Sequence, residues 1–245
     1  TSQEWMPFSY TLFYMRYVDG LLDALQGTGY HLAVKSPDPN KDFAKELEAL
    51  APVALIWKGG AGISRDMVLE LNRKYPVIGI TAVAPPGINT VDVDQERVVA
   101  IACEHLRELG HERIAYAGGT KGHARIRRRA IEQYAEDHEL PEPASFVVDA
   151  EPTRPKGEII LDEWESLGED RPTAMLMADF YALKGLEEAG RRGLRIPEDL
   201  SIVGIDNTPD CETCRPRLTS VHQPLEAVCK AAIEMAIDPN KDRSG

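Results

Sequence analysis

An aspartate at the end of an apolar run is the first residue whose position suggests chemistry. Asp206 closes the run Ser201–Ile205, which is typical of a buried strand. Ligands of open parallel sheets bind beyond the carboxyl ends of the strands, and a carboxylate there can accept two hydroxyl hydrogen bonds from a polyol. The alternative is that the Asp206-Asn207 pair forms a turn in which the side chain caps its own backbone. Asp206 is therefore a candidate for ligand binding, with a turn as the competing explanation.

Two more aspartates stand immediately before segments with helical periodicity. Asp94 precedes residues 95–109, and Asp179 precedes residues 180–192. N-capping explains an aspartate in this position, because its carboxylate accepts a hydrogen bond from a backbone amide of the first helical turn. Contact with a bound ligand is the alternative for both residues.

Five basic side chains gather in a short segment, namely Lys121, Arg125, Arg127, Arg128 and Arg129. The guanidinium fork of an arginine can bridge two sugar hydroxyls or bind a carboxylate. The alternative is a solvated basic start of a helix, or a weak phosphate contact. We expect Arg128 and Arg129 to be solvated.

A lone Cys-x-x-Cys pair, Cys211 and Cys214, could be redox-active or form half of a metal site. Neither a second such pair nor a zinc-type spacing of the histidines accompanies it. The sequence also lacks a Walker phosphate loop, a Gly-x-Gly-x-x-Gly after the first strands and a Gly-x-Ser-x-Gly elbow. We therefore expect no metal site, no cofactor and no enzymatic activity.

The overall charge limits the partners of the chain. Its 245 residues carry 28 Lys and Arg against 40 Asp and Glu, a net charge of -12, which repels DNA and anionic lipid. No apolar run approaches the roughly 20 residues of a membrane span, and residues 1–7 do not resemble a signal peptide. The sequence does not start with Met, so we expect it to begin inside a longer protein. Four cysteines are too few for a disulfide scaffold, which favours a reducing, cytoplasmic location.

Short apolar runs alternate with helical segments along the whole chain, which predicts an α/β fold with parallel sheets. The expected strands are His31–Val34, Val53–Trp57, Val77–Ile80, Ile114–Ala117, Phe146–Val148, Ala174–Ala178 and Ile202–Ile205. The expected helices span residues 12–28, 95–109, 125–138, 156–167, 180–192 and 225–237. The expected buried stripe of the first helix is Leu12, Met15, Val18, Leu22 and Leu25. These strands are too many for one small sheet, so we expect the chain to divide into two parts near Gly118-Gly119.

Three segments of the sequence share a pattern with a known family. They are Val91–Gln95 with Glu104–Gly119, Pro172–Asp179, and Gly193–Asn207 with Pro216–Pro224. These segments resemble the effector-binding core of the lac-repressor-like (LacI/GalR) transcription regulators, and the similarity extends from about Phe13 to about Met235. The third segment is the most specific, since sugar-binding transport proteins share the fold but rarely this combination of runs.

The resemblance implies an α/β protein with two doubly wound parallel-sheet subdomains of the type I periplasmic-binding-protein-like class, facing each other across a cleft. By analogy, residues 1–119 with 223–245 form the N-terminal subdomain, and residues 120–222 form the C-terminal subdomain. Full-length members carry an N-terminal DNA-binding headpiece, which is absent from this chain.

The resemblance also selects the residues expected to bind an effector. Arg127 matches the family's effector-binding arginine, although Ala130 and Ile131 replace the glycine and the aromatic residue that normally follow it. Gln223 matches a cleft position, and its amide can donate and accept at once. Ala178 replaces an asparagine that usually touches ligand. The expected set is Arg127, Asp206, Asp94, Asp179, Gln223, Phe13 and Phe180, where the two phenylalanines offer aromatic faces to a sugar ring.

The function that the resemblance implies is the effector-binding and dimerisation core of a bacterial transcription regulator. We expect a homodimer, a small-molecule effector that is a sugar or sugar derivative, and contact with operator DNA through the headpiece. A purine-like effector remains open, and we expect no membrane association. The alternative function is a periplasmic solute-binding protein of a sugar transport system, which predicts a signal peptide upstream and a monomer.

Overall fold

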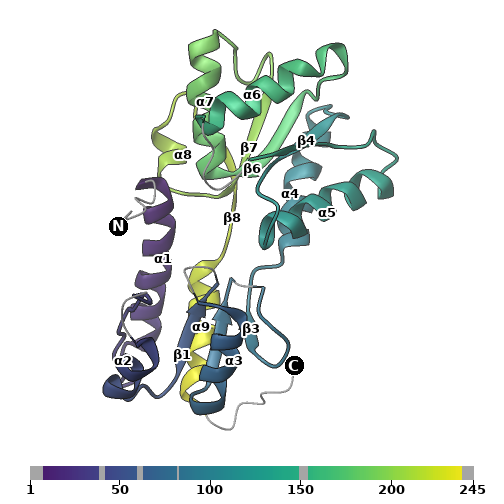
Figure 1. The fold of residues 1–245 in the computed structure, drawn as a ribbon. Coiled ribbons are helices and arrows are strands. Elements are labelled where there is room, and N and C mark those ends of the chain that lie inside the picture. Colours follow the sequence, from purple (N-terminus) through teal and green to yellow (C-terminus); the bar gives the residue numbers. More distant parts are fainter. Residues whose placement is uncertain (1–7, 39–41, 60–62, 82, 149–153, 239–245) are drawn as a thin grey trace. The chain divides into compact units, whose positions relative to one another are not determined.

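The computed structural model describes residues 8–38, 42–59, 63–81, 83–148 and 154–238 (Figure 1). The chain divides into two compact units, each built on a parallel sheet. Unit 1 comprises Asp94–Gln223 together with the residues up to Phe13. Unit 2 comprises Tyr14–Val93 together with the residues from Pro224 onward.

The sheet of unit 1 has five parallel strands in the order β5-β4-β6-β7-β8. Their bounds are Ile114–Gly118 for β4, Ala144–Val147 for β5, Ala174–Ala178 for β6, Ser201–Asp206 for β7 and Thr219–His222 for β8. Strands β4, β6 and β7 are almost completely buried, as expected for central strands covered on both faces. All five strands run in the same direction, so their carboxyl ends meet at one edge of the sheet.

Two pairs of helices accompany this sheet. Their bounds are Gln95–Glu108 for α4, His123–Asp137 for α5, Lys156–Ser166 for α6 and Asp179–Arg192 for α7, and short helical turns η1 (Gly168–Asp170) and α8 (Asp210–Thr213) lie in the connections. Helices α6 and α7 pack against each other, as do α4 and α5. Alternate strand residues such as Ala115 and Met175 join one core with Leu161 and Trp164 of α6.

Unit 2 has a sheet of three parallel strands in the order β1-β2-β3. The strands are β1 (Leu55–Lys58), β2 (Val77–Ile80) and β3 (Asn89–Val91). The helices are α2 (Phe43–Leu50), α3 (Arg65–Lys74), α9 (Leu225–Ile237) and, from Tyr14 onward, α1 (Phe8–Leu25). The core beside α2 and α3 contains Phe43, Leu47, Val68, Leu71, Val77 and Ile88. Helix α9 returns from the far end of the chain and packs against β2 and β3.

The division of the chain lies elsewhere than the sequence predicts. We expected residues 1–119 in one subdomain, but β4 pairs with β5 and β6 of unit 1. The boundary after the sheet of unit 2 therefore falls between Val93 and Asp94, and the predicted boundary at Gly119 is wrong. The double glycine after β4 turns the chain at the end of a central strand, which the sequence alone does not distinguish from a boundary. Residues 1–7 and 239–245, which the prediction assigned to one subdomain, lie outside the described residues.

Six of the seven expected strands form, and the expected strand His31–Val34 is wrong. Its residues adopt no regular structure, and the side chain of Val34 is 69% exposed. Two edge strands, β3 and β8, were missed because both consist of half-buried and exposed residues and contain no apolar run. In α1, Tyr17, Leu21 and Leu25 are buried, whereas Met15 and Leu22 of the expected stripe are exposed.

The close packing of α6 on α7 depends on Gly157. A Cβ atom at this position would collide with the carbonyl of Lys184, so we expect Gly157→Ala to lower the free energy of unfolding by about 1–3 kcal/mol. Gly190→Ala in the exposed part of α7 is the matched control, because its Cβ meets nothing within 4 Å and alanine favours a helix by about 0.5–1 kcal/mol. Urea-induced unfolding measures both variants, and equal stabilities would contradict this packing.

Candidate functional site

Four polar side chains of unit 1 form a connected group, which we call the polar ring: Gln95, Arg127, Asp206 and Gln223. Arg127 Nε donates to Gln95 Oε1 at 2.7 Å, and Gln95 Nε2 donates to Gln223 Oε1 at 3.2 Å. Gln223 Nε2 donates to Asp206 Oδ1. Asp206 Oδ1 lies 4.0 Å from Arg127 Nη2, which closes the ring.

The polar ring draws on four different elements at the carboxyl end of the sheet. Asp206 is the last residue of β7, and Gln223 follows β8 directly. Gln95 is the first residue of α4, and Arg127 lies in the second turn of α5. None of the four residues is more than 9% exposed. Such a buried polar group at the carboxyl edge of a parallel sheet is in the place where these folds bind ligands.

The charges of the polar ring compensate each other. A buried ion loses its hydration and costs several kcal/mol unless partners replace it, and here the guanidinium of Arg127 faces the carboxylate of Asp206. Asp206 and Asn207 also have positive φ angles, 124° and 50°. Such backbone conformations are uncommon outside glycine, and they cluster at functional sites. The ring therefore offers donors and acceptors in fixed positions without net charge, which suits hydroxyl groups.

Tyr116 adjoins the polar ring, because its phenol lies within hydrogen-bonding reach of the guanidinium of Arg127. The side chain is buried in β4, and burial raises the pKa of its phenol, while the positive charges of Arg127 and Arg128 act against this rise. The phenol is thus neutral at physiological pH and can donate a hydrogen bond. Sequence reasoning missed Tyr116, because a tyrosine inside an apolar strand cannot be told from an ordinary core residue.

Arg128 is anchored to the protein, so the expectation that it is solvated is wrong. Its guanidinium donates to Ser145 Oγ and, at 3.1 Å, to the carbonyl oxygen of Gly119. The same group lies over the ring of Tyr116, 5.9 Å from the centroid. Arg129 is exposed as expected. Arg127 and Arg128 follow each other in α5, and both donate hydrogen bonds to other parts of unit 1.

Asp94 caps α4, as the N-capping explanation proposed. Its carboxylate accepts a hydrogen bond of 2.8 Å from the backbone amide of Arg97, and the residue is exposed. The next residue, Gln95, enters the polar ring instead. The sequence identified this pair of residues but selected the capping member, and an N-capping aspartate is itself the signal that the following residue starts the helix.

Asp179 is completely buried and holds several elements of unit 1 together. Its carboxylate accepts from the amide and hydroxyl of Thr208 at 2.7 and 3.0 Å, and from Ser220 Oγ at 2.6 Å. Cys211 Sγ donates at 3.1 Å. Burial raises the pKa of Asp179, while these donors act against the rise. A Cβ atom on Gly204 would collide with this carboxylate, so only glycine fits there.

The explanation of Asp179 as an N-cap is wrong. Helix α7 begins at Asp179 itself, Ala178 occupies the cap position, and no side chain caps this end. The carboxylate instead bonds to the segment after β7 and to β8. Its contact with an effector stays a prediction.

Cys211 and Cys214 are free thiols with structural surroundings. Burial and the neighbouring Asp179 carboxylate raise the pKa of Cys211 to about 12, which opposes the thiolate that redox chemistry and metal binding require. Cys214 Sγ donates to the carbonyl oxygens of Cys211 and Pro216. Within the described part of the chain, no group of three His, Cys, Asp or Glu side chains could hold a metal ion.

Of the two phenylalanines of the expected site, Phe180 lies at the start of α7, whereas Phe13 lies in the second turn of α1. Phe13 is half-buried in α1. Phe180 is also half-buried. The centroid of its ring lies 5.4 Å from that of Tyr181 and 5.8 Å from the ammonium nitrogen of Lys156. Stacking of either ring on an effector stays a prediction.

Residues 103–244 match the model of a family described as the periplasmic binding protein-like domain. The chain belongs to this family. The two sheets with parallel strands and the interleaved helices agree with that assignment, and they confirm the predicted fold class.

Members of this family with regulatory names are homologous to the chain. Catabolite control protein A of Priestia megaterium is 29% identical, and the alignment covers 94% of this chain and 72% of the relative. The HTH-type transcriptional repressor PurR of Aliivibrio fischeri is 30% identical over 72% of this chain, and the chain spans about half the length of that relative, 54%. The resemblance to lac-repressor-like regulators is thereby confirmed.

A solved structure of the same fold is that of a LacI family transcriptional regulator from Enterococcus faecium with bound ribose. Its TM-score against this chain is 0.77 at 22% identity, and the match covers 94% of this chain and 88% of that chain.

None of the helices within the described residues is long and apolar enough to cross a membrane.

Asp179 allows a test of how unit 1 is held together. We expect Asp179→Ala to lower the free energy of unfolding by about 3 kcal/mol, because it leaves several buried donors unpaired. Asp94→Ala is the matched control, since it removes one capping hydrogen bond at an exposed helix start and costs about 1 kcal/mol. Chemical unfolding monitored by circular dichroism compares them. An Asp179→Ala variant no less stable than Asp94→Ala would refute this role.

Proposed function

We propose that the chain is the effector-binding core of a bacterial transcription regulator and that the polar ring binds the effector. The observation that carries this proposal is the buried, charge-compensated group of Gln95, Arg127, Asp206 and Gln223 at the carboxyl edge of the sheet. The homology to named repressors supports a regulatory role over a transport role. A ligand switches such a protein only if it binds the two functional states with different affinities.

The proposed effector is a sugar or sugar derivative. Asp206 and the glutamine oxygens accept hydrogen bonds, while Arg127 and the glutamine amides donate them, so vicinal hydroxyl groups find both kinds of partner. A strongly anionic ligand gains less, because Asp206 already offsets the charge of Arg127. The ribose-bound structure of the same fold supports this class, and a purine-like effector is the alternative that a ligand screen must include.

The proposed partners follow from the regulatory role. The chain forms a homodimer, works in the cytoplasm and performs no catalysis. Operator DNA is contacted by a separate DNA-binding module of the full-length protein, because the net charge of -12 opposes phosphate binding by this chain itself.

Arg127 and Asp206 provide the test of the proposed site. A thermal-shift screen of sugars, sugar phosphates and nucleobases identifies the effector, and calorimetry then measures its Kd. We expect Arg127→Ala and Asp206→Ala each to raise this Kd, because losing a charged partner to a buried ligand costs about 2–5 kcal/mol, roughly 30- to several-thousand-fold.

Arg129→Ala is the matched control for Arg127→Ala. Arg129 lies in the same helix and is exposed, so its removal should leave the Kd unchanged. Arg128 is unsuitable as a control, because it anchors α5 to Ser145 and Gly119. An unchanged Kd in both ring variants would show that the effector binds elsewhere.

A further inference from the structure

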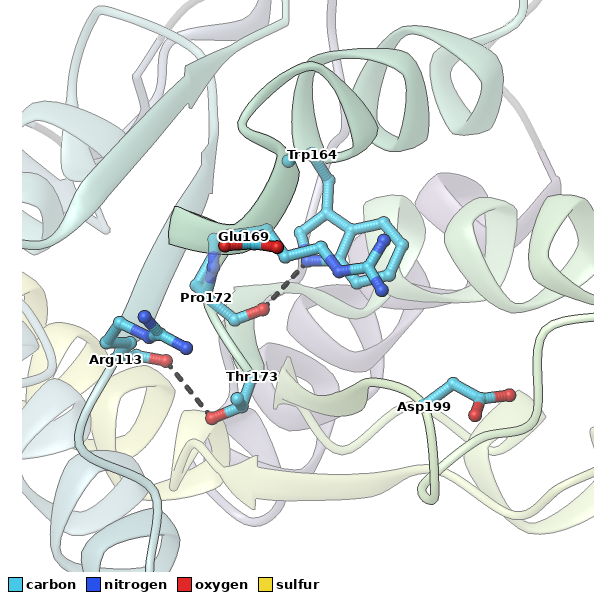
Figure 2. Close-up of a pocket in the computed structure, with 8 residues that line it drawn as sticks. Arg113, Trp164, Glu169, Pro172, Thr173 and Asp199 are labelled. Carbon is cyan, nitrogen blue, oxygen red and sulfur yellow. Dashed lines mark hydrogen bonds between the residues drawn. The ribbon is translucent and has the colours of Figure 1, made fainter.

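Unit 1 contains a cavity of about 550 Å³ at the opposite edge of its sheet from the polar ring (Figure 2). Its walls come from the segments that lead into three neighbouring strands: Arg113 precedes β4, Thr173 precedes β6, and Asp199 lies shortly before β7. Trp164 at the end of α6 and Glu169 of η1 complete it. The volume lies within the range of small-molecule sites, about 300–1,000 Å³.

Two arginines face this cavity. The guanidinium of Arg171 stacks on the ring of Trp164, 4.5 Å from its centroid. Arg113 is exposed at the neighbouring strand entrance. Among the interactions of the described residues, neither guanidinium forms a salt bridge or a hydrogen bond. Two guanidinium forks beside one cavity suit a carboxylate or another small oxyanion.

The floor of the cavity is held rigidly. The backbone amide of Thr173 donates to the carbonyl of Arg113 at 3.0 Å, and Trp164 Nε1 donates to the carbonyl of Pro172 at 2.8 Å, a contact drawn in Figure 2. His111 lies between the hydroxyls of Thr173 and Ser201, at 2.8 and 2.9 Å. These hydrogen bonds fix the backbone segments that carry Arg113 and Arg171, so the two side chains start from defined positions beside the cavity.

Two carboxylates beside the cavity, those of Asp199 and Glu169, restrict the class of ligand that it can bind. Arg195 holds the Asp199 carboxylate through its backbone amide and its guanidinium, which lowers the pKa of Asp199 to about 2 and keeps it ionised. Glu169 is exposed on the other wall. These negative charges disfavour a polyanion, but their oxygens can accept hydrogen bonds from a hydroxyl or ammonium group.

We propose that this cavity binds a small organic acid that also carries a hydroxyl or ammonium group. Arg113 and Arg171 hold the acid group, and Asp199 and Glu169 accept from the donor group. The site is separate from the polar ring, so the proposal does not depend on the proposed effector.

Ligand-observed NMR with glycolate and L-serine as probes tests this site on the full chain. We expect at least one of them to bind with a Kd of about 1–10 mM, as is typical for so few atoms. Acetate, which lacks the donor group, should bind at least about threefold more weakly. Arg113→Gln should raise the Kd of the binding probe at least about tenfold.

Two variants control this experiment. Arg129→Gln removes an exposed arginine of the same unit outside the cavity, and Arg127→Ala changes the polar ring, and both should leave probe binding unchanged. Absence of binding by both probes overturns the proposal, as does equal binding to Arg113→Gln. Acetate binding as tightly as the probes overturns the role of Asp199 and Glu169. Loss of probe binding in an Arg127→Ala variant that keeps its folded circular dichroism spectrum would mean that the probes occupy the polar ring.

Discussion

The compensation of two buried charges is the constraint on which the proposed site depends. Arg127 and Asp206 are both buried at the end of the sheet of unit 1, where an isolated ion costs several kcal/mol. Their atoms are 4.0 Å apart, too far for a hydrogen bond, so Gln95 and Gln223 connect them. An amide suits this position because it donates on one side and accepts on the other. A ligand hydroxyl can therefore take the place of such a contact without leaving either ion unpaired.

The buried carboxylate of Asp179 positions two members of the polar ring, Asp206 and Gln223. Asp179 binds Thr208, two residues after Asp206, and Ser220 on β8, three residues before Gln223. The glycine at position 204 leaves room for this carboxylate beside β7. Asp179 thus fixes the ends of β7 and β8 relative to each other, and the positions of Asp206 and Gln223 follow from it. Asp179 therefore acts through packing and hydrogen bonding, whereas the polar ring is the part that we propose recognises the effector.

Patterns of buried residues made much of unit 1 predictable from the sequence. Fully buried strands such as β4, β6 and β7 are continuous apolar runs, and the resemblance placed Arg127, Asp206 and Gln223 at one site. The edge strands β3 and β8 escaped because half-exposed strands carry no such run. The run His31–Val34 has strand composition, yet it pairs with no strand among the described residues. Local sequence indicates the capacity to form a strand, whereas pairing depends on distant residues.

The prediction of single site residues from the sequence was limited for the same reason. The sequence favoured Asp94 over Gln95 and could not recognise Tyr116, because the choice depends on which neighbour faces the interior of unit 1. The N-cap explanation succeeded for Asp94 and failed for Asp179, although both precede helical segments. The difference arises from Thr208, Cys211 and Ser220, which surround Asp179 from segments about 30–40 residues away in sequence.

A crystal structure of the chain with its effector is the most direct test of the central claim that the polar ring is the recognition site. The account predicts ligand hydroxyl groups within about 2.6–3.2 Å of Asp206 Oδ and Arg127 Nη atoms, with at least one hydrogen bond of the ring replaced by a bond to ligand. An effector bound elsewhere, with the hydrogen bonds of Gln95 and Gln223 unchanged, would contradict it.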